Sequence, residues 1–222
     1  MNRSSGQIEA VFFDLDGTLL DTAPDLHAAC NEILRRYHKP LVPFKDFRQW
    51  VHGGSLMMIG NSFRIDQNHA LFSEIKEQFL TQYQKNINHQ TQLFTGIEQV
   101  LTYLESKKIP WGIITNKLTY LTEPLLDFFN LKSRCCCLVC GDTLPKIKPD
   151  PAPLLHACQL TQVKPELCVY VGDSSSDIQA ANSANMLSIA AHYGYWVQWP
   201  GVIANGEAKK PEDIIYMLEQ WL

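Results

Sequence analysis

The chain has 222 residues, of which 45% are hydrophobic, and its formal net charge is −4 without any block of like charges. This composition is typical of a globular protein and excludes a strongly basic surface for binding nucleic acid. No segment reaches the roughly 18 uninterrupted apolar residues of a membrane span. The polar start Met1–Gly6 lacks the apolar stretch of a signal peptide, so we expect a cytoplasmic protein with no membrane partner.

Five short apolar runs alternate with amphipathic, helix-like stretches along most of the chain. The predicted strands are Ala10–Phe13, Trp111–Ile114, Cys135–Cys140, Leu167–Val171 and Leu187–Ala191, and the predicted helices are Gly96–Lys107, Tyr120–Phe129, Ala152–Gln159, Ser175–Ala184 and Glu212–Leu222. Strands that alternate with helices form a parallel sheet with helices on both faces. The sequence therefore predicts a Rossmann-like α/β core built from residues 1–21 and 93–222.

One long segment interrupts this alternation directly after the first strand. Apolar residues recur at spacings of three and four in Pro24–Tyr37, Phe44–Phe63 and Asn68–Gln84, which indicates helices. The glycines of His52-Gly53-Gly54 predict a turn inside the middle stretch. We therefore expect residues 22–92 to form an all-helical cap domain inserted into the α/β core.

Four of the seven cysteines lie in one apolar run, at positions 135, 136, 137 and 140. Free cysteines are usually buried, so this run predicts reduced thiols in a buried strand. Cys137 and Cys140 form a C-x-x-C pair. A structural zinc site needs a second ligand pair of similar spacing, which the sequence lacks, so core packing is the favoured interpretation.

Two carboxylates follow the first predicted strand, in Asp14-Leu15-Asp16-Gly17-Thr18. Residues two apart on an extended chain point the same way. One carboxylate could therefore attack phosphorus while the other handles a proton. Gly17 permits a sharp turn of the chain there. A plain turn needs no pair of acids after a buried strand, so Asp14 and Asp16 are candidate catalytic residues.

A second pair of acids follows the fourth predicted strand. The four-residue spacing of Asp173 and Asp177 places both on one face of the first turn of a helix. Together with Asp14 they would form a negative cluster, and clustered carboxylates repel one another unless a cation lies among them. Oxygen ligands favour a hard ion, and magnesium is the usual partner of phosphate chemistry. We therefore expect a Mg²⁺ site at this end of the sheet.

Donors and positive charge for a phosphate follow the second and third predicted strands. Thr115 offers a hydroxyl, the backbone N–H of Asn116 a second donor, and Lys148 an ammonium that could reach both phosphate and Asp14. Lys146 and Lys117 are competitors for the role of Lys148. Ligands of open α/β sheets bind beyond the carboxyl ends of the strands, where all these residues are expected to converge.

The motifs together resemble the haloacid dehalogenase superfamily. Residues 14–22, DLDGTLLDT, are similar to its first signature, Thr115-Asn116-Lys117 to its second, Lys148-Pro149 to its third and residues 172–177, GDSSSD, to its fourth. The helical insert lies where this family has its cap. Within the family, Ala23-Pro24-Asp25-Leu26 and residues 148–154 resemble the phosphoglycolate phosphatase-like branch. Leu93-Phe94-Thr95-Gly96, residues 111–117 and Tyr193-Gly194-Tyr195 resemble the neighbouring N-acetylmuramic acid 6-phosphate phosphatases.

The resemblance implies a phosphatase whose substrate is a small phosphorylated metabolite. Asp14 would form an aspartyl-phosphate, and Asp16 would first protonate the leaving alcohol and then deprotonate the water that hydrolyses the intermediate. One Asp14 oxygen, the Asp16 carbonyl and Asp173 would hold Mg²⁺, with Asp177 behind them or linked through water. Thr115, Asn116 and Lys148 would bind the phosphoryl group. The protein would act as a monomer or a homodimer.

Three alternative hypotheses about the function use these residues. A phosphomutase would use the same core and differ in its cap. A true haloacid dehalogenase needs no metal, and the acids at 173 and 177 disfavour it. A non-catalytic binding protein has no need of the full set of acids, threonine and lysine. For substrate choice, His52, Gly53 and Gly54 are the candidate cap residues, because binding residues concentrate on loops.

Overall fold

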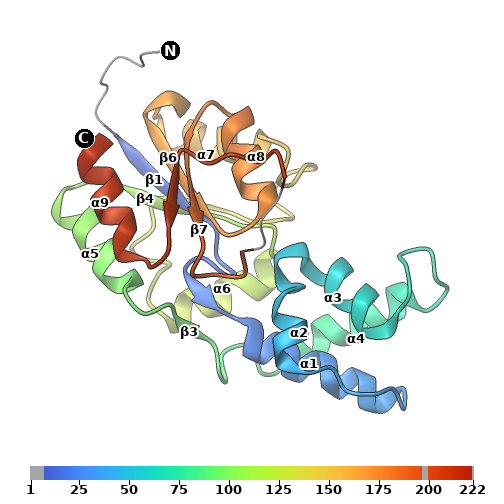
Figure 1. The fold of residues 1–222 in the computed structure, drawn as a ribbon. Coiled ribbons are helices and arrows are strands. Elements are labelled where there is room, and N and C mark those ends of the chain that lie inside the picture. Colours follow the sequence, from blue (N-terminus) through green and yellow to red (C-terminus); the bar gives the residue numbers. More distant parts are fainter. Residues whose placement is uncertain (1–7, 197–199, 222) are drawn as a thin grey trace.

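The computed structural model describes residues 8–196 and 200–221; the polar start Met1–Gly6 and the end residue Leu222 lie outside them. A six-stranded sheet forms the centre of the molecule, and a group of helices stands beside it (Figure 1). The strands are β1 (Ala10–Phe13), β4 (Trp111–Ile114), β5 (Leu138–Val139), β6 (Cys168–Gly172), β7 (Leu187–Ala191) and β8 (Gly206–Ala208). The predicted α/β fold is confirmed.

The sheet is parallel throughout and has the order β5-β4-β1-β6-β7-β8. Strand β1 lies between β4 and β6, with Val11 opposite both Trp111 and Val169. All four of its residues are buried, as expected of a parallel strand covered on both faces. The central place of β1 puts its carboxyl end, and therefore Asp14, in the middle of the sheet edge.

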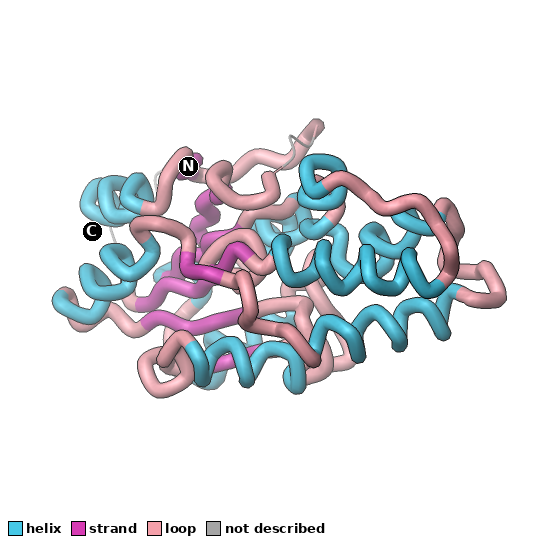
Figure 2. The backbone as a smooth tube through the Cα atoms, turned by 90° about the horizontal axis from the view of Figure 1, so that it is seen from below, coloured by secondary structure: helices cyan, strands magenta, loops and turns pink. Residues whose placement is uncertain are grey.

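Helices cover both faces of the sheet (Figure 2). They are α5 (Ile97–Ser106), α6 (Thr119–Phe128), α7 (Ala152–Thr161), α8 (Ser175–Ser183) and α9 (Glu212–Trp221). Successive residues of a strand point to opposite faces. Accordingly Phe13 joins the larger core cluster with α5 and α9, whereas Phe12 joins the smaller one with α7 and α8.

The segment between β1 and β4 contains a group of mutually packed helices. They are α1 (Ala23–Arg36), α2 (Phe44–Arg48), the 3₁₀ turn η1 (Val51–Gly53), α3 (Gly54–Phe63) and α4 (Phe72–Gln84). Buried apolar side chains such as Leu26, Ile33, Ile75 and Phe79 form its interior. The middle stretch, expected at 44–63, is divided at η1, so the turn predicted at His52-Gly53-Gly54 is present there.

Two short strands lie where the chain passes from the sheet to this helical group and back. β2 (Leu20–Asp21) pairs antiparallel with β3 (Gln92–Leu93), and Leu20 faces Leu93. Asp25 at the start of α1 accepts hydrogen bonds from the backbone N–H groups of Gln90 and Thr91 and from the Thr91 hydroxyl. The outgoing and returning chains are therefore held together where the helical group begins and ends.

The prediction for the cysteine-rich run was wrong in part. β5 contains only Leu138 and Val139; Cys135 lies half-buried and Cys136 exposed before it. The run begins in the turn that follows α6, where the chain has not yet entered the sheet. Cys137 and Cys140 are buried, as expected, and all seven cysteines are free. Among the described residues, no helix is long and apolar enough to cross a membrane.

Candidate active site

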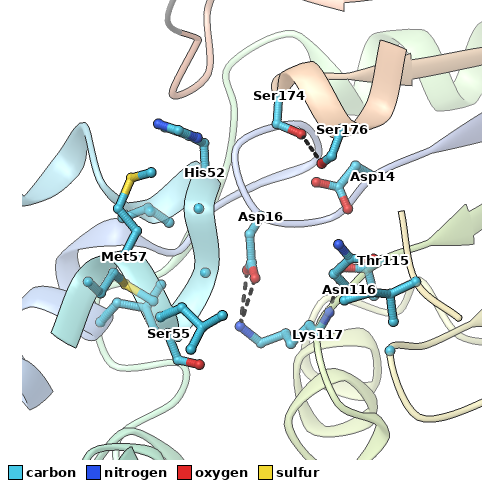
Figure 3. Close-up of a pocket in the computed structure, with 18 of the residues that line it drawn as sticks. Asp14, Asp16, His52, Ser55, Met57, Thr115, Asn116, Lys117, Ser174 and Ser176 are labelled. Atoms are coloured by element: carbon cyan, nitrogen blue, oxygen red, sulfur yellow. Dashed lines mark hydrogen bonds and ion pairs between the residues drawn. The ribbon is translucent and has the colours of Figure 1, made fainter. Parts of the chain in front are cut away.

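A cavity of about 560 Å³ lies where the carboxyl ends of β1, β4 and β6 face the helical group. Asp14, Thr115 and Asp173 each follow one of these adjacent strands and line the cavity. Lys148, from the loop after β5, enters the same space. The topology therefore brings together the core residues predicted from the sequence, of which Figure 3 labels Asp14 and Thr115.

Three buried carboxylates form the centre of the site. Asp14, Asp173 and Asp177 each place one oxygen within 4.8 Å of the others. Burial raises the pKa of Asp14 to about 6, although the Lys148 ammonium opposes this shift. Burial, with the negative charges of Asp14 and Asp177, also raises the pKa of Asp173 well above its ordinary value. The charged forms of this cluster therefore lack sufficient positive charge.

The expected placement of the second acid pair in one helical turn was wrong for Asp173. Asp173 lies between the end of β6 and the helix cap Ser174, and only Asp177 is inside α8. Asp177 closes a capping box with Ser174: the Ser174 N–H donates to Asp177 Oδ2 at 3.0 Å and its hydroxyl donates at 2.6 Å. Asp177 Oδ1 accepts from Lys148 Nζ at 2.6 Å. Both Asp177 oxygens are therefore engaged by protein donors.

Lys148 provides the positive charge at the centre of the cluster. Its buried Nζ lies 2.9 Å from Asp14 Oδ1 and 2.6 Å from Asp177 Oδ1, and it also contacts the Tyr170 hydroxyl at 2.7 Å and the Ile114 carbonyl at 2.9 Å. Burial opposes the charged form, but the Asp14 and Asp177 carboxylates outweigh it and raise the pKa of Lys148. Of the three lysines that competed in the sequence, Lys148 is the one that reaches Asp14.

Asn116 has a role that the sequence did not reveal. Its side-chain amide donates to the Lys148 carbonyl at 2.9 Å, and its side-chain oxygen accepts from the Lys148 N–H at 3.0 Å. This two-way bond fixes the loop that carries Lys148 to the end of β4. Thr115 is buried beside it and lines the cavity.

The Asp16 side chain points to Lys117 and away from Asp14 (Figure 3). Its carboxylate accepts from Lys117 Nζ at 3.0 and 3.1 Å and from the Thr22 hydroxyl at 2.7 Å. Lys117 also contacts the hydroxyl of Tyr83, on α4, at 3.1 Å. The second expected catalytic acid is therefore held at the boundary between the sheet and the helices.

The segment Tyr193-Gly194-Tyr195 holds acidic side chains in place through hydrogen bonds of Tyr195. The Tyr195 N–H donates to Asp173 Oδ2 at 2.9 Å, and the Tyr195 hydroxyl contacts Asp21 Oδ1 at 2.8 Å and the Ala23 N–H at 2.9 Å. Gly17 has a φ of +85°, and a Cβ there would collide with the Asp173 carboxylate. The sequence indicated this segment only through a family resemblance, because Asp21 and Ala23, the partners of its Tyr195 hydroxyl, lie more than 170 residues away in the chain.

The candidate cap residues His52, Gly53 and Gly54 line the side of the cavity that belongs to the helical group. In Figure 3 the His52 ring lies near Met57 and points away from Asp14. Burial lowers the pKa of this half-buried histidine. The structure thus places the η1 turn opposite the acids, with Met57 and Ser55 next to it.

We expect the variant Lys148→Met to lose about 3 kcal/mol of unfolding free energy, because it leaves the Asp14 and Asp177 carboxylates buried without their cation. Urea unfolding of the metal-free protein measures this loss. Lys146→Met is the matched control two residues away, where the ion pair with Asp150 is exposed. Similar stabilities for the two variants would contradict the proposed electrostatic role of Lys148.

Known proteins resemble the chain over most of its length. Residues 11–191 match the model of the haloacid dehalogenase-like hydrolase family. A phosphoglycolate phosphatase from Xanthomonas campestris is 42% identical over 84% of this chain and 84% of its own. An N-acetylmuramic acid 6-phosphate phosphatase from Pseudomonas putida is 35% identical over 85% of both chains. A crystal structure from Haemophilus somnus, described as a predicted phosphoglycolate phosphatase, has a TM-score of 0.85 at 27% identity and covers 96% of this chain and 98% of its own.

The chain belongs to the haloacid dehalogenase-like hydrolase family, as the family model and the parallel sheet with its acids at the strand ends together establish. Its relatives are named phosphatases, and it is accordingly a hydrolase of the phosphatase kind.

Proposed function

We propose that the protein is a Mg²⁺-dependent phosphomonoesterase in which Asp14 is the nucleophile and Asp16 the proton donor and acceptor. The observation that carries this proposal is the buried ion pair between Asp14 and Lys148 inside a cluster of three carboxylates. A nucleophilic carboxylate needs a fixed orientation, and Lys148 provides it. The same ammonium can offset charge on a phosphoryl group that Asp14 attacks.

Mg²⁺ fits the acid cluster. Three buried carboxylates share one ammonium, and the pKa values of Asp14 and Asp173 are raised, first by burial and then by the neighbouring carboxylates. Asp14, Asp173 and the Asp16 carbonyl would hold the ion, since a set of oxygen donors suits a hard cation. Asp177 would not contact the ion directly, because its two oxygens already accept hydrogen bonds from Lys148 and Ser174. When bound, the ion supplies positive charge that offsets the phosphoryl oxygens.

The chemistry would take two displacements at phosphorus. An Asp14 oxygen attacks, the bond between phosphorus and the leaving oxygen breaks, and Asp16 gives its proton to that oxygen. Asp16 then takes a proton from water, which attacks the aspartyl-phosphate and releases inorganic phosphate and the Asp14 carboxylate. The Thr115 hydroxyl, the Asn116 N–H and the Lys148 ammonium would stabilise the phosphoryl oxygens. The Asn116 side chain holds the Lys148 loop, and its N–H is the part proposed for the phosphate.

The helical group would be the cap that reads the leaving group. We propose that residues 22–92 form this cap and residues 1–21 and 93–222 the core. The antiparallel pair β2 and β3, where the chain leaves the core and returns to it, supports these bounds. Asp14, Asp16, Thr115, Lys148 and Asp173 all fall outside the cap. A cap that closes over such a site can exclude bulk water during the reaction.

Two substrate classes are candidates. The higher identity to a phosphoglycolate phosphatase favours phosphoglycolate. The cavity of about 560 Å³ leaves room for an amino-sugar phosphate, which favours N-acetylmuramic acid 6-phosphate as the second candidate. A phosphomutase of the same fold would return the phosphoryl group to a product instead of releasing it.

A panel of phosphate esters, assayed for free phosphate with and without Mg²⁺, tests the proposed function. We expect Mg²⁺-dependent phosphate release from at least one of the two candidate substrates. Conversion of a sugar phosphate to an isomer without phosphate release would favour a mutase. If the protein binds the esters but does not convert them in the presence of Mg²⁺, the result would favour a non-catalytic binding protein.

We expect a bulky residue at Gly53 to change substrate preference. A Cβ there would lie 2.7 Å from the Met57 Cβ, so Gly53→Val displaces the cavity wall opposite the acids. The ratio of kcat/KM for N-acetylmuramic acid 6-phosphate to that for p-nitrophenyl phosphate should fall by roughly tenfold, the effect of about 1.4 kcal/mol. Gly60→Ala in α3, the helix that follows Gly53, is the control, since its Cβ would meet only the Ile65 carbonyl at 3.2 Å. Equal losses for both substrates would remove the η1 turn from substrate selection.

A further inference from the structure

Lys117 connects the two halves of the site. Its Nζ lies 3.0 and 3.1 Å from the two Asp16 oxygens, 3.1 Å from the Tyr83 hydroxyl and 4.5 Å from the centre of the Tyr83 ring. The Lys117 side chain is only 6% exposed. Asp16 follows β1, whereas Tyr83 belongs to α4, so this ammonium lies between the phosphate end of the cavity and the helical group (Figure 3).

The charge of Lys117 is separate from that of Lys148. Lys148 is committed to Asp14 and Asp177, whereas Lys117 is paired with Asp16. Apolar residues that line the cavity include Leu26, Leu80, Leu118, Leu121 and Phe79. An ammonium among apolar side chains requires an anionic partner, because burial of an unpaired charge is costly. Asp16 provides that partner in this structure.

Proton donation by Asp16 conflicts with this pairing. A carboxyl group that carries a proton for the leaving oxygen has no negative charge to offer Lys117, and in Figure 3 the Asp16 carboxylate points to Lys117 and away from Asp14. Lys117 would lose its anion at the moment when Asp16 acts. Another carboxylate in the cavity would resolve the conflict by taking the place of Asp16 on the ammonium.

We propose that Lys117 is a specificity-determining residue that binds a carboxylate on the leaving group and thereby releases Asp16 to donate its proton. This inference rests on the proposed function and narrows its substrates to phosphomonoesters whose leaving alcohol carries a carboxylate. Phosphoglycolate and N-acetylmuramic acid 6-phosphate both have such a group. Asp16 occupies the position of the substrate carboxylate in this structure, and Tyr83 holds Lys117 in reach of it.

Two matched pairs of esters test the inference. Phosphoglycolate is compared with 2-hydroxyethyl phosphate, and N-acetylmuramic acid 6-phosphate with N-acetylglucosamine 6-phosphate, which lacks the carboxylate-bearing ether. For each pair kcat and KM are measured in the parent, in Lys117→Met and in Lys117→Arg. Lys76→Met, another cation that lines the cavity, is the control.

We expect the parent to prefer the carboxylate-bearing member of at least one pair, and the pair that shows the preference identifies the source of the carboxylate. Lys117→Met should reduce this preference about ten- to hundredfold, the effect of one charge-assisted hydrogen bond. Lys117→Arg should retain most of it, and Lys76→Met should leave it unchanged.

Three results would overturn the inference. Equal losses for both members in Lys117→Met would confine Lys117 to the support of Asp16. Loss of the preference in Lys76→Met instead would show that Lys76, on α4, binds the substrate carboxylate. A parent without preference in either pair would also refute it, and if that parent still releases phosphate with Mg²⁺, the proposed function stands. Absence of phosphate release from every ester would instead refute the proposed function.

Discussion

Asp14→Asn should lose phosphatase activity by a factor on the order of 10⁴ or more while keeping its fold, because an amide of nearly the same shape is a poor nucleophile. Asp14 is the one cluster acid that follows the central strand β1, and its Oδ1 lies 2.9 Å from Lys148 Nζ. The remaining ion pair of Lys148 with Asp177, at 2.6 Å, should hold the lysine in place in the variant. Phosphate release under substrate saturation is the measurement, and circular dichroism checks the fold.

The matched control is Asp127→Asn, which changes an exposed carboxylate on α6 outside the cavity. It should behave as the parent does. Substantial activity in well-folded Asp14→Asn would assign the nucleophile to another residue.

Removal of divalent metal should stop turnover, and Mg²⁺ should restore it. Asp14, Asp173 and Asp177 each place one oxygen within 4.8 Å of the others, and Lys148 is their one cation, so the positive charge falls short of three carboxylates unless a metal is present. We expect a loss of at least about a hundredfold on chelation, since the metal offsets several kcal/mol of charge in the transition state. Ca²⁺ should restore activity poorly, because its looser coordination misplaces the attacking oxygen.

A binding measurement separates a catalytic ion from a structural one. Thermal unfolding of Asp14→Asn and of the parent, each titrated with Mg²⁺, should show stabilisation of the parent and a weaker response of the variant. Full turnover after exhaustive removal of metal would contradict the proposed role of the acid cluster.

The strand ends of the core could be predicted because their signals are local. Buried runs such as Ala10–Phe13 are followed at once by acids or by Thr115, and the parallel topology needs only the alternation of strands with helices. The strands β2, β3 and β8 escaped prediction because runs of two or three residues carry no measurable periodicity.

The contacts that join distant parts of the chain could not be predicted in the same way. Lys117 meets Asp16 across 101 positions, and Tyr195 reaches Asp21 across 174. No pattern of spacing encodes such pairs; they arise from the packing of the helical group against the sheet edge. For the same reason the sequence ranked Lys148 above Lys117 for the phosphate but did not indicate that Lys117 pairs with Asp16, the second acid proposed for catalysis.

The central claim is that a phosphoryl group passes through Asp14. Asp16→Asn should slow hydrolysis of the intermediate, because the amide cannot take a proton from water; p-nitrophenyl phosphate can still form the intermediate, because its phenolate leaves without a proton from Asp16. Rapid mixing of this variant with p-nitrophenyl phosphate and Mg²⁺, followed by acid quench and mass spectrometry of the peptide that contains residues 10–20, measures the intermediate directly. The account predicts the added mass of one phosphoryl group on Asp14, absent when Asp14 is also replaced by Asn. Release of p-nitrophenolate with an unmodified Asp14 peptide at every time point would contradict it.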